Sequence, residues 1–295
     1  MTKLDEFVTI REAAKFLGVD PYPNLRTLVD VLGQDLPSAA TRGGTWQLSS
    51  VPHAASRGPA KGGKPLSVYA KGAIFYGVKT GLNGAFVIDE EKRAELISAS
   101  PKCKRVIWPL VTGKDIERWY AGVSGKYLLY MEHGIDVGQM PAAIGHLRPF
   151  RDQLEGRATK QAWYELQQPQ SRYAREFKKP KILYQVFQVK PCFAYDAQGM
   201  MINNSIYAIA LDDLYLLGIL NSTPFWSEIC RHCSPIQNGY QLMLTYFEKS
   251  IIPDASTKER GEIEALVEKC VAAHGRECSE CEAEIDARVA LLYGL

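Results

Sequence analysis

Residues 76–89 constrain the fold more than any other stretch, because two short apolar runs flank a turn of small and polar residues. Residues 73–76 and 85–88 have the length and apolar content of buried or half-buried strands. Residues 79–84 lie between them and include glycine and asparagine, which tolerate the left-handed backbone of a tight turn. The pattern predicts a strand, a polar turn and a strand. The turn carries a cation, a hydroxyl and an amide, and such a loop on a rigid scaffold is a common binding surface.

Charge is unevenly distributed along the chain, although the net charge is only +2. Residues 36–88 contain no Asp or Glu, and residues 148–190 hold ten Lys or Arg against four acidic residues. Residues 254–295 hold ten acidic residues against five basic ones. A cluster of basic residues is typical of a surface that binds phosphate groups. It is equally typical of an ordinary solvent-exposed protein surface.

The N-terminal region predicts a small helical unit. Thr9 and Glu12 form a capping box, and Gly18 ends the helix that they start. A second helix begins near Pro23, so the arrangement is similar to the helix-turn-helix of excisionase-type or MerR-type DNA binders, and also to an ordinary packed helix pair. Residues 36–65 are rich in Gly, Ser, Ala and Pro and are typical of a linker.

The rest of the chain predicts a mixed α+β domain. We expect a helical turn at residues 116–120, a helix over residues 141–157 and a strand over residues 182–189. A capping box of Ser256 with Glu259 opens the acidic tail, whose two apolar stripes predict an antiparallel helix pair.

Five stretches, in order, resemble one known family, the TaqI-like C-terminal specificity domain. That family is the DNA target-recognition domain of adenine-specific methyltransferases and of fused type IIG restriction-modification enzymes. The stretches are residues 77–89 (GVKTGLNGAFVID), 108–119 (WPLVTGKDIERW), 141–157, 216–222 (LLGILNS) and 284–295 (EIDARVALLYGL). The resemblance covers roughly residues 64–295.

The resemblance implies sequence-specific recognition of double-stranded DNA. A separate methyltransferase or nuclease domain or subunit would supply the chemistry, with S-adenosylmethionine there, and Mg²⁺ if it is a nuclease. We expect that part to precede residue 1, so that this chain is a fragment or a split specificity subunit without a cofactor of its own. The expected domains are a helical segment with linker (1–60), a mixed-sheet target-recognition domain (61–255) and the helix pair (256–295).

The candidate DNA-binding residues are cations that would neutralise phosphates and polar residues near them. Asn83, Gln185 and Gln237 are of the side-chain types that can pair bidentately with adenine in the major groove. The full set is Lys79, Thr80, Asn83, Lys114, Arg118, Arg157, Lys160, Lys178, Lys179, Lys181, Gln185 and Gln237.

The sequence predicts no catalytic residue, since it lacks the Asp/Asn/Ser-Pro-Pro-Tyr/Phe tetrapeptide of adenine methyltransferases. Two Cys-x-x-Cys pairs, 230–233 and 278–281, are compatible with zinc, but buried thiols explain them as well. Three alternatives stay open: a complete DNA-modifying enzyme with an unrecognised site, a helix-turn-helix transcription factor, and a protein-interaction module that uses the acidic helix pair. The charged N-terminus and the lack of an 18-residue apolar run predict a cytoplasmic protein without a membrane span.

Overall fold

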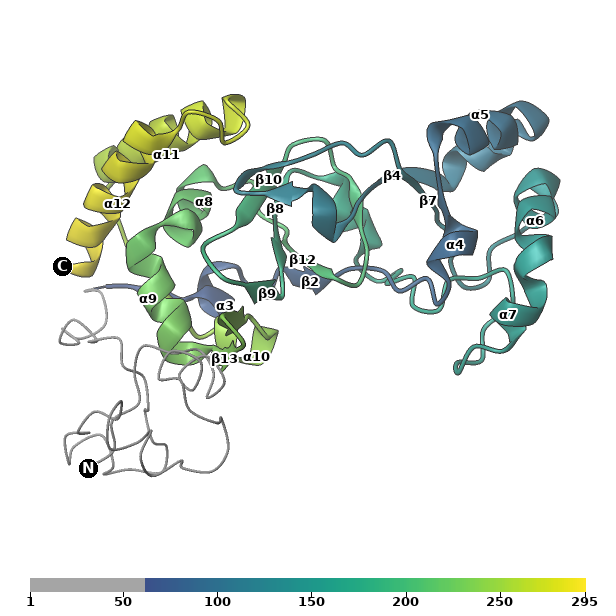
Figure 1. Ribbon diagram of the computed structural model, residues 1–295, viewed down its shortest axis with the longest axis horizontal. Helices are drawn as coiled ribbons and strands as arrows, with labels where there is room; N and C mark the ends of the chain where they lie inside the picture. Colours follow the sequence, from purple (N-terminus) through teal and green to yellow (C-terminus); the bar gives the residue numbers. More distant parts are fainter. Residues whose placement is uncertain (1–61) are drawn as a thin grey trace, which may run out of the picture. The chain divides into compact units, whose positions relative to one another are not determined.

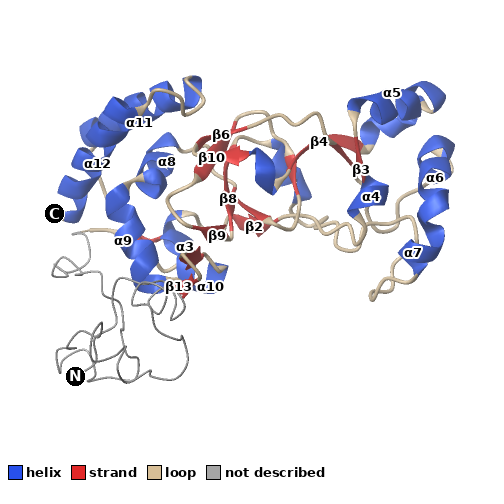
Figure 2. Cartoon of the chain, in the orientation of Figure 1, coloured by secondary structure: helices blue, strands red, loops and turns tan. Residues whose placement is uncertain are grey.

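The computed structural model describes residues 62–295. The expected N-terminal helix pair, with its capping box at Thr9, lies outside the described residues. Within the described part, residues 62–235 and 239–295 belong to one compact unit. Mixed sheets and helices confirm the predicted α+β class (Figures 1 and 2).

A six-stranded mixed sheet forms the centre of the unit. Its pairs are antiparallel except for one parallel pair, β10 with β6. In spatial order its strands are β2 (Ile74–Tyr76), β12 (Ile206–Ile209), β8 (Lys181–Gln185), β10 (Phe193–Asp196), β6 (Trp119–Ala121) and β5 (Ile116–Glu117).

Side chains that alternate along these strands enter two different cores. On β8, Ile182 and Tyr184 belong to one buried cluster, whereas Leu183 belongs to the other. On β10, Phe193 and Ala194 divide in the same way. Successive residues of a strand point to opposite faces of a sheet, so this sheet separates two hydrophobic cores.

A four-stranded sheet and its helices share one hydrophobic core with one face of the central sheet. Asp89 starts helix α5 by accepting a hydrogen bond from the Lys92 amide at 2.8 Å. The strands are, in order, β11 (Met201–Ile202), β4 (Ile107–Val111), β7 (Tyr127–Leu129) and β3 (Val87–Ile88). The helical elements are α4 (Asn83–Phe86), α5 (Glu90–Ala99), η2 (Pro101–Arg105), η3 (Gly113–Asp115), α6 (Pro141–Leu147), η4 (Arg148–Phe150), α7 (Arg151–Glu155) and η5 (Ala174–Lys178).

Mainly helices cover the other face, where the acidic tail packs (Figure 1). Ser256 and Glu259 form the expected capping box, and α11 and α12 are antiparallel neighbours that also contact α8 and α9. The helices here are α3 (Leu66–Tyr69), α8 (Leu214–Asn221), α9 (Thr223–His232), α10 (Leu244–Phe247), α11 (Thr257–Ala272) and α12 (Ser279–Tyr293). The short strands are β1 (Lys64–Pro65), paired with β15 (Ile251–Ile252), β14 (Gly239–Gln241), paired with β9 (Phe187–Gln188), and β13 (Ser234–Ile236), which precedes β14.

Three local expectations need correction. The expected helical turn at residues 116–120 is wrong. These residues form the antiparallel strands β5 and β6, whose backbone groups bond to each other. The expected strand at residues 85–88 begins with the one-turn helix α4 and is a strand only over β3. Because β2 and β3 lie in different sheets, the segment between them crosses from one sheet to the other. The expected strand at residues 182–189 is interrupted, as β8 and β9 join different partners.

Candidate nucleic-acid interface

The turn that follows β2 is tied to a distant loop. Lys79 and Gln168 exchange two backbone hydrogen bonds, at 3.0 and 2.8 Å, and the Gln167 amide donates to the Thr80 carbonyl oxygen. Within the turn, the Thr80 hydroxyl donates to Asn83 Oδ1 at 2.7 Å, which leaves the Asn83 amide nitrogen to face solvent. The fold therefore brings the Lys79 turn against the second basic block (residues 148–190), although about 80 residues of sequence separate them.

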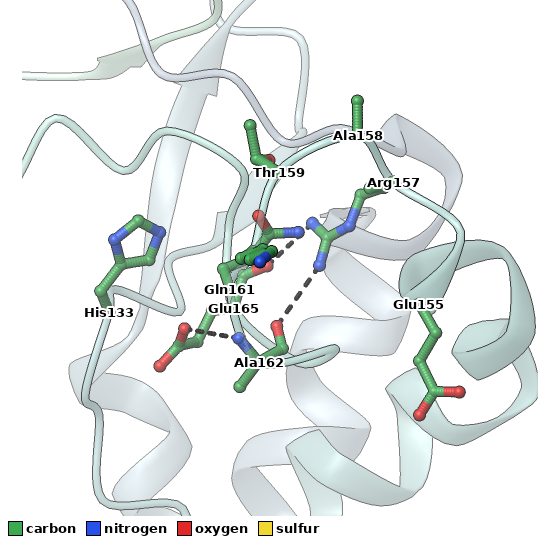
Figure 3. A pocket seen from close by; sticks show the side chains of 9 residues that line it. His133, Glu155, Arg157, Ala158, Thr159, Gln161, Ala162 and Glu165 are labelled. Carbon is green, nitrogen blue, oxygen red and sulfur yellow. Dashed lines mark hydrogen bonds between the residues drawn. The ribbon is translucent and has the colours of Figure 1, made fainter.

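Arg157 joins the same two segments from the inside. Its guanidinium donates five hydrogen bonds at distances from 2.8 to 3.4 Å, and all five acceptors are backbone carbonyl oxygens. Figure 3 draws the bonds to Ala162 and Glu165. The acceptors belong to Thr80, Leu154, Ala162, Trp163 and Glu165. Burial lowers the pKa of this guanidinium, which remains charged at neutral pH because arginine is ionised throughout that range.

A second group lies around the short helix η3. Lys114 is exposed at its centre, and the Gln185 amide donates to the carbonyl oxygen of Gly113. Gly113 packs closely against Gln185 and Ser205. The turn that holds Ser205 also contacts the end of β2, because the Val78 amide donates to Ile202 O and Val78 pairs with Asn203. Residues 202–205 thus contact both the Lys114 turn and the chain that leads into the Lys79 turn.

The cations of η5 and its C-terminal end differ in environment. Lys178 Nζ lies 3.5 Å from the centroid of the Trp108 ring, and the other partner of that ring is the stacked Tyr130 at 4.2 Å. Burial lowers the pKa of Lys178. Lys179 is exposed and pairs with Glu176 at 2.8 Å, an exposed ion pair of little energetic weight.

Two candidate residues have their charges paired inside the chain. Lys181 is fully buried, where it donates to Asp196 and to the Phe177 carbonyl oxygen, and burial lowers its pKa. Arg118 pairs with Glu282 of α12 at 2.8 Å and donates to a backbone carbonyl oxygen of α8 at 2.7 Å. Both side chains hold parts of the fold together in this structure.

Gln237 lies in the turn between β13 and β14, with a positive φ of 51°, and its side chain is exposed. The structure therefore groups Lys79, Thr80, Asn83, Arg157 and Lys160 around one pair of loops, and Lys114 with Gln185 around η3. Gln237 takes part in none of the hydrogen bonds that connect these two groups.

An open hollow of about 860 Å³ lies beside the Arg157 loop (Figure 3). Glu165 fixes its floor, because this buried carboxylate accepts from the amides of Gly134 at 2.6 Å and Ala162 at 2.9 Å. The lining residues are His133, Glu155, Arg157, Ala158, Thr159, Lys160, Gln161, Ala162 and Glu165. Sequence reasoning identified two of these cations but not the supporting carboxylate, since nothing in the sequence marks which backbone amides Glu165 reaches.

Metal ligands do not cluster in the described part of the chain: residues 62–295 hold no group of three or more His, Cys, Asp or Glu placed to bind a metal ion. The two Cys-x-x-Cys pairs lie on different helices, at the end of α9 and the start of α12. Burial raises the pKa of the Cys233 thiol to about 12, so this thiol stays protonated. Among the described helices, none combines the length and the apolar character that a membrane crossing requires.

The fold of this chain is similar to that of a solved restriction-modification enzyme. No curated protein matches the sequence. The type IIL restriction-modification enzyme MmeI, solved in complex with DNA, is similar with a TM-score of 0.56 and 14% identity over 75% of this chain. The type IIG restriction endonuclease BpuSI aligns over 78% of this chain at 10% identity, with a TM-score of 0.42. The chain spans about a third of either enzyme, 32% of the first and 31% of the second.

The family model of the TaqI-like C-terminal specificity domain matches residues 108–248. Three of the five stretches that carried the resemblance lie inside this range, at residues 108–119, 141–157 and 216–222. The stretches at residues 77–89 and 284–295 lie outside it. Residues 108–248 are therefore similar to the TaqI-like C-terminal specificity domain, over a little less than half of the chain.

Proposed function

We propose that this chain is the DNA target-recognition part of a restriction-modification system of the adenine-methylating type. A methyltransferase or nuclease domain or subunit carries out the chemistry, with S-adenosylmethionine bound there, and Mg²⁺ if it is a nuclease. The specificity-domain match supports this proposal, as does the fold shared with an enzyme that was solved in complex with DNA. A reader of cellular DNA with free cysteines suits the cytoplasm.

The observation that carries the proposal is the joining of two basic segments. The Lys79 turn and the loop that holds Lys160 are connected by backbone hydrogen bonds and by the Arg157 guanidinium. Lys114 lies on the adjoining η3, so cations from three separate parts of the sequence are held on one framework. Lys and Arg on a common surface neutralise phosphates and release counterions, which is the main source of affinity for DNA.

Charged residues that the chain already pairs internally are left out of the proposed surface. Lys181 and Arg118 serve the fold, whereas Lys79, Lys114, Lys160 and Lys178 supply the positive charge. Asn83 offers a solvent-facing amide on the same turn as Lys79, so it can reach a base edge once the cations have fixed the register. Gln185 supports the Lys114 turn through its amide.

The acidic helices α11 and α12 stand outside this surface. Their carboxylates would repel a phosphate backbone, and several are paired within the helices, as in Arg260 with Glu264 and Arg288 with Glu284. We assign to this pair the role of packing against the body of the domain, which its contacts with α8 and α9 support.

The test is fluorescence anisotropy of the purified chain with a randomised duplex pool across a salt series, followed by selection and sequencing. We expect binding that weakens steeply with salt and an enriched motif. The variants Lys79→Ala, Lys114→Ala and Lys160→Ala should each lower the salt slope by about 1, with similar losses on all sequences.

Lys258→Ala on α11 is the matched control, because this lysine is 86% exposed and lies on the acidic helix. It should leave the slope unchanged. Binding that none of the three lysine variants alters would exclude the proposed face. A chain that binds no duplex even at low salt would exclude DNA recognition and would favour the interaction-module alternative.

A further inference from the structure

The segment between α7 and Ala162 has no regular secondary structure, yet both of its ends are fixed. Arg157 lies at its start and donates to the carbonyl oxygens of Ala162 and Trp163 at its end. Glu165 accepts from the Ala162 amide and from the Gly134 amide. The loop formed by residues 158–161 is therefore closed by two buried or half-buried side chains (Figure 3).

A count of donors shows what Arg157 is able to do. A guanidinium has five N–H donors. Here Nε makes one hydrogen bond, Nη1 makes two and Nη2 makes two, all to backbone carbonyl oxygens. Every donor is used, so Arg157 has none left for a phosphate. The bond to Thr80 O extends the clamp to the Lys79 turn, and the Arg157 chain also packs against Gly81.

The loop itself presents polar groups of three kinds. Thr159 and Lys160 are exposed, and Gln161 is half-buried at the edge of the hollow. Gln161 Oε1 is buried without a hydrogen-bond donor in the described structure, which is a cost that a donor from a bound partner would remove. A hydroxyl and an amide can read base edges in a groove of duplex DNA, while the Lys160 ammonium between them contacts the phosphate backbone.

We infer that residues 158–161 form a base-reading loop, and that Arg157 is a positioning residue that holds this loop and the Lys79 turn at one spacing without touching DNA. The inference rests on the proposed function and adds to it which segment reads sequence and which cation does not bind phosphate. Gln161 supplies the amide that pairs with a base edge, because its Oε1 has no hydrogen-bond donor within the described structure.

Arg157→Lys is the first test, since it keeps the charge but cannot make five hydrogen bonds. Affinity for the selected motif should fall by about 5- to 150-fold, the range for losing one good base contact, while affinity for random duplex and the salt slope stay unchanged. Arg172→Lys is the matched control on an exposed arginine and should change neither. All measurements are made below the thermal transition of each variant.

Gln161→Ala is the second test and leaves the clamp intact, so it is independent of any loss of folding in the Arg157 variant. Selection with this variant should yield a motif relaxed at one position. An unchanged motif would overturn the role of the loop. If Arg157→Lys keeps the wild-type affinity for the selected motif and Arg157→Ala lowers the salt slope by about 1, then Arg157 binds phosphate and the positioning role is wrong. Absence of DNA binding by the wild-type chain would overturn the proposed function itself, before any variant is compared.

Discussion

Replacing Lys181 by methionine should destabilise the fold and leave DNA affinity unchanged. The amine and its partner Asp196 are both fully buried, and the amine also donates to the Phe177 carbonyl oxygen. Removing one member of a buried ion pair costs about 3–5 kcal/mol, because the remaining charge stays in a medium of low dielectric. Asp196 keeps three backbone amide donors at 2.8–3.1 Å, so we expect a loss near 3 kcal/mol, at the low end of that range.

Urea unfolding measures this loss, as a lower midpoint with an unchanged slope. For a domain of this size, 3 kcal/mol corresponds to a melting temperature lower by about 6–12 °C. Lys179→Met is the matched control, because Lys179 is exposed and its pair with Glu176 is a surface one that contributes about 0–1 kcal/mol. A Lys181→Met variant with the wild-type midpoint and a salt slope for DNA reduced by about 1 would refute the reasoning, since Lys181 would then be a phosphate contact.

Three further predictions concern other parts of the fold. Gly77→Ala should cost about 1–3 kcal/mol in urea unfolding, because a Cβ there would overlap the Asn203 carbonyl oxygen and break the hydrogen bonds that join β2 to that turn. Burial raises the pKa of Tyr130 to about 12 in the folded state, whereas an unfolded tyrosine titrates near pH 10. The free energy of unfolding should therefore fall between pH 10 and 12. In Tyr130→Phe, the urea midpoints at pH 9 and pH 11 should differ less than they do in the wild type. Arg118→Ala should lower stability by about 1–2 kcal/mol through loss of its bond to Glu282, and a salt slope equal to that of the wild type in anisotropy would support its structural role, whereas a lower slope would contradict it.

Local features of the fold were predictable because they depend on near neighbours. Asp89 accepts from an amide three residues later, and Ser256 with Glu259 forms a capping box, so these helix starts could be identified without tertiary information. Helix α8 begins after Asp213 for the same reason. The family resemblance was likewise predictable, since it rests on short ordered motifs, three of which lie in residues 108–248.

Elements whose backbone partners are distant were harder to predict. Residues 116–120 have a sequence that suits a helical turn, but β6 pairs with β10, which is more than 70 residues away. Trp119 adopts a positive φ of 76° there and is fully buried, a conformation that tertiary packing must stabilise. Local propensity is too weak to oppose such pairing.

The sequence by itself determined the chemical types at the candidate interface, their clustering into basic blocks, and the similarity of residues 108–248 to the TaqI-like C-terminal specificity domain. Only the tertiary structure decided which cations reach solvent. Lys179 and Lys181 differ by two positions, yet one is exposed and the other is wholly buried against Asp196. All five N–H donors of Arg157 are bonded to backbone carbonyl oxygens. Burial and hydrogen-bond saturation depend on atoms brought together from distant parts of the chain, and a linear pattern of residue types contains no record of them.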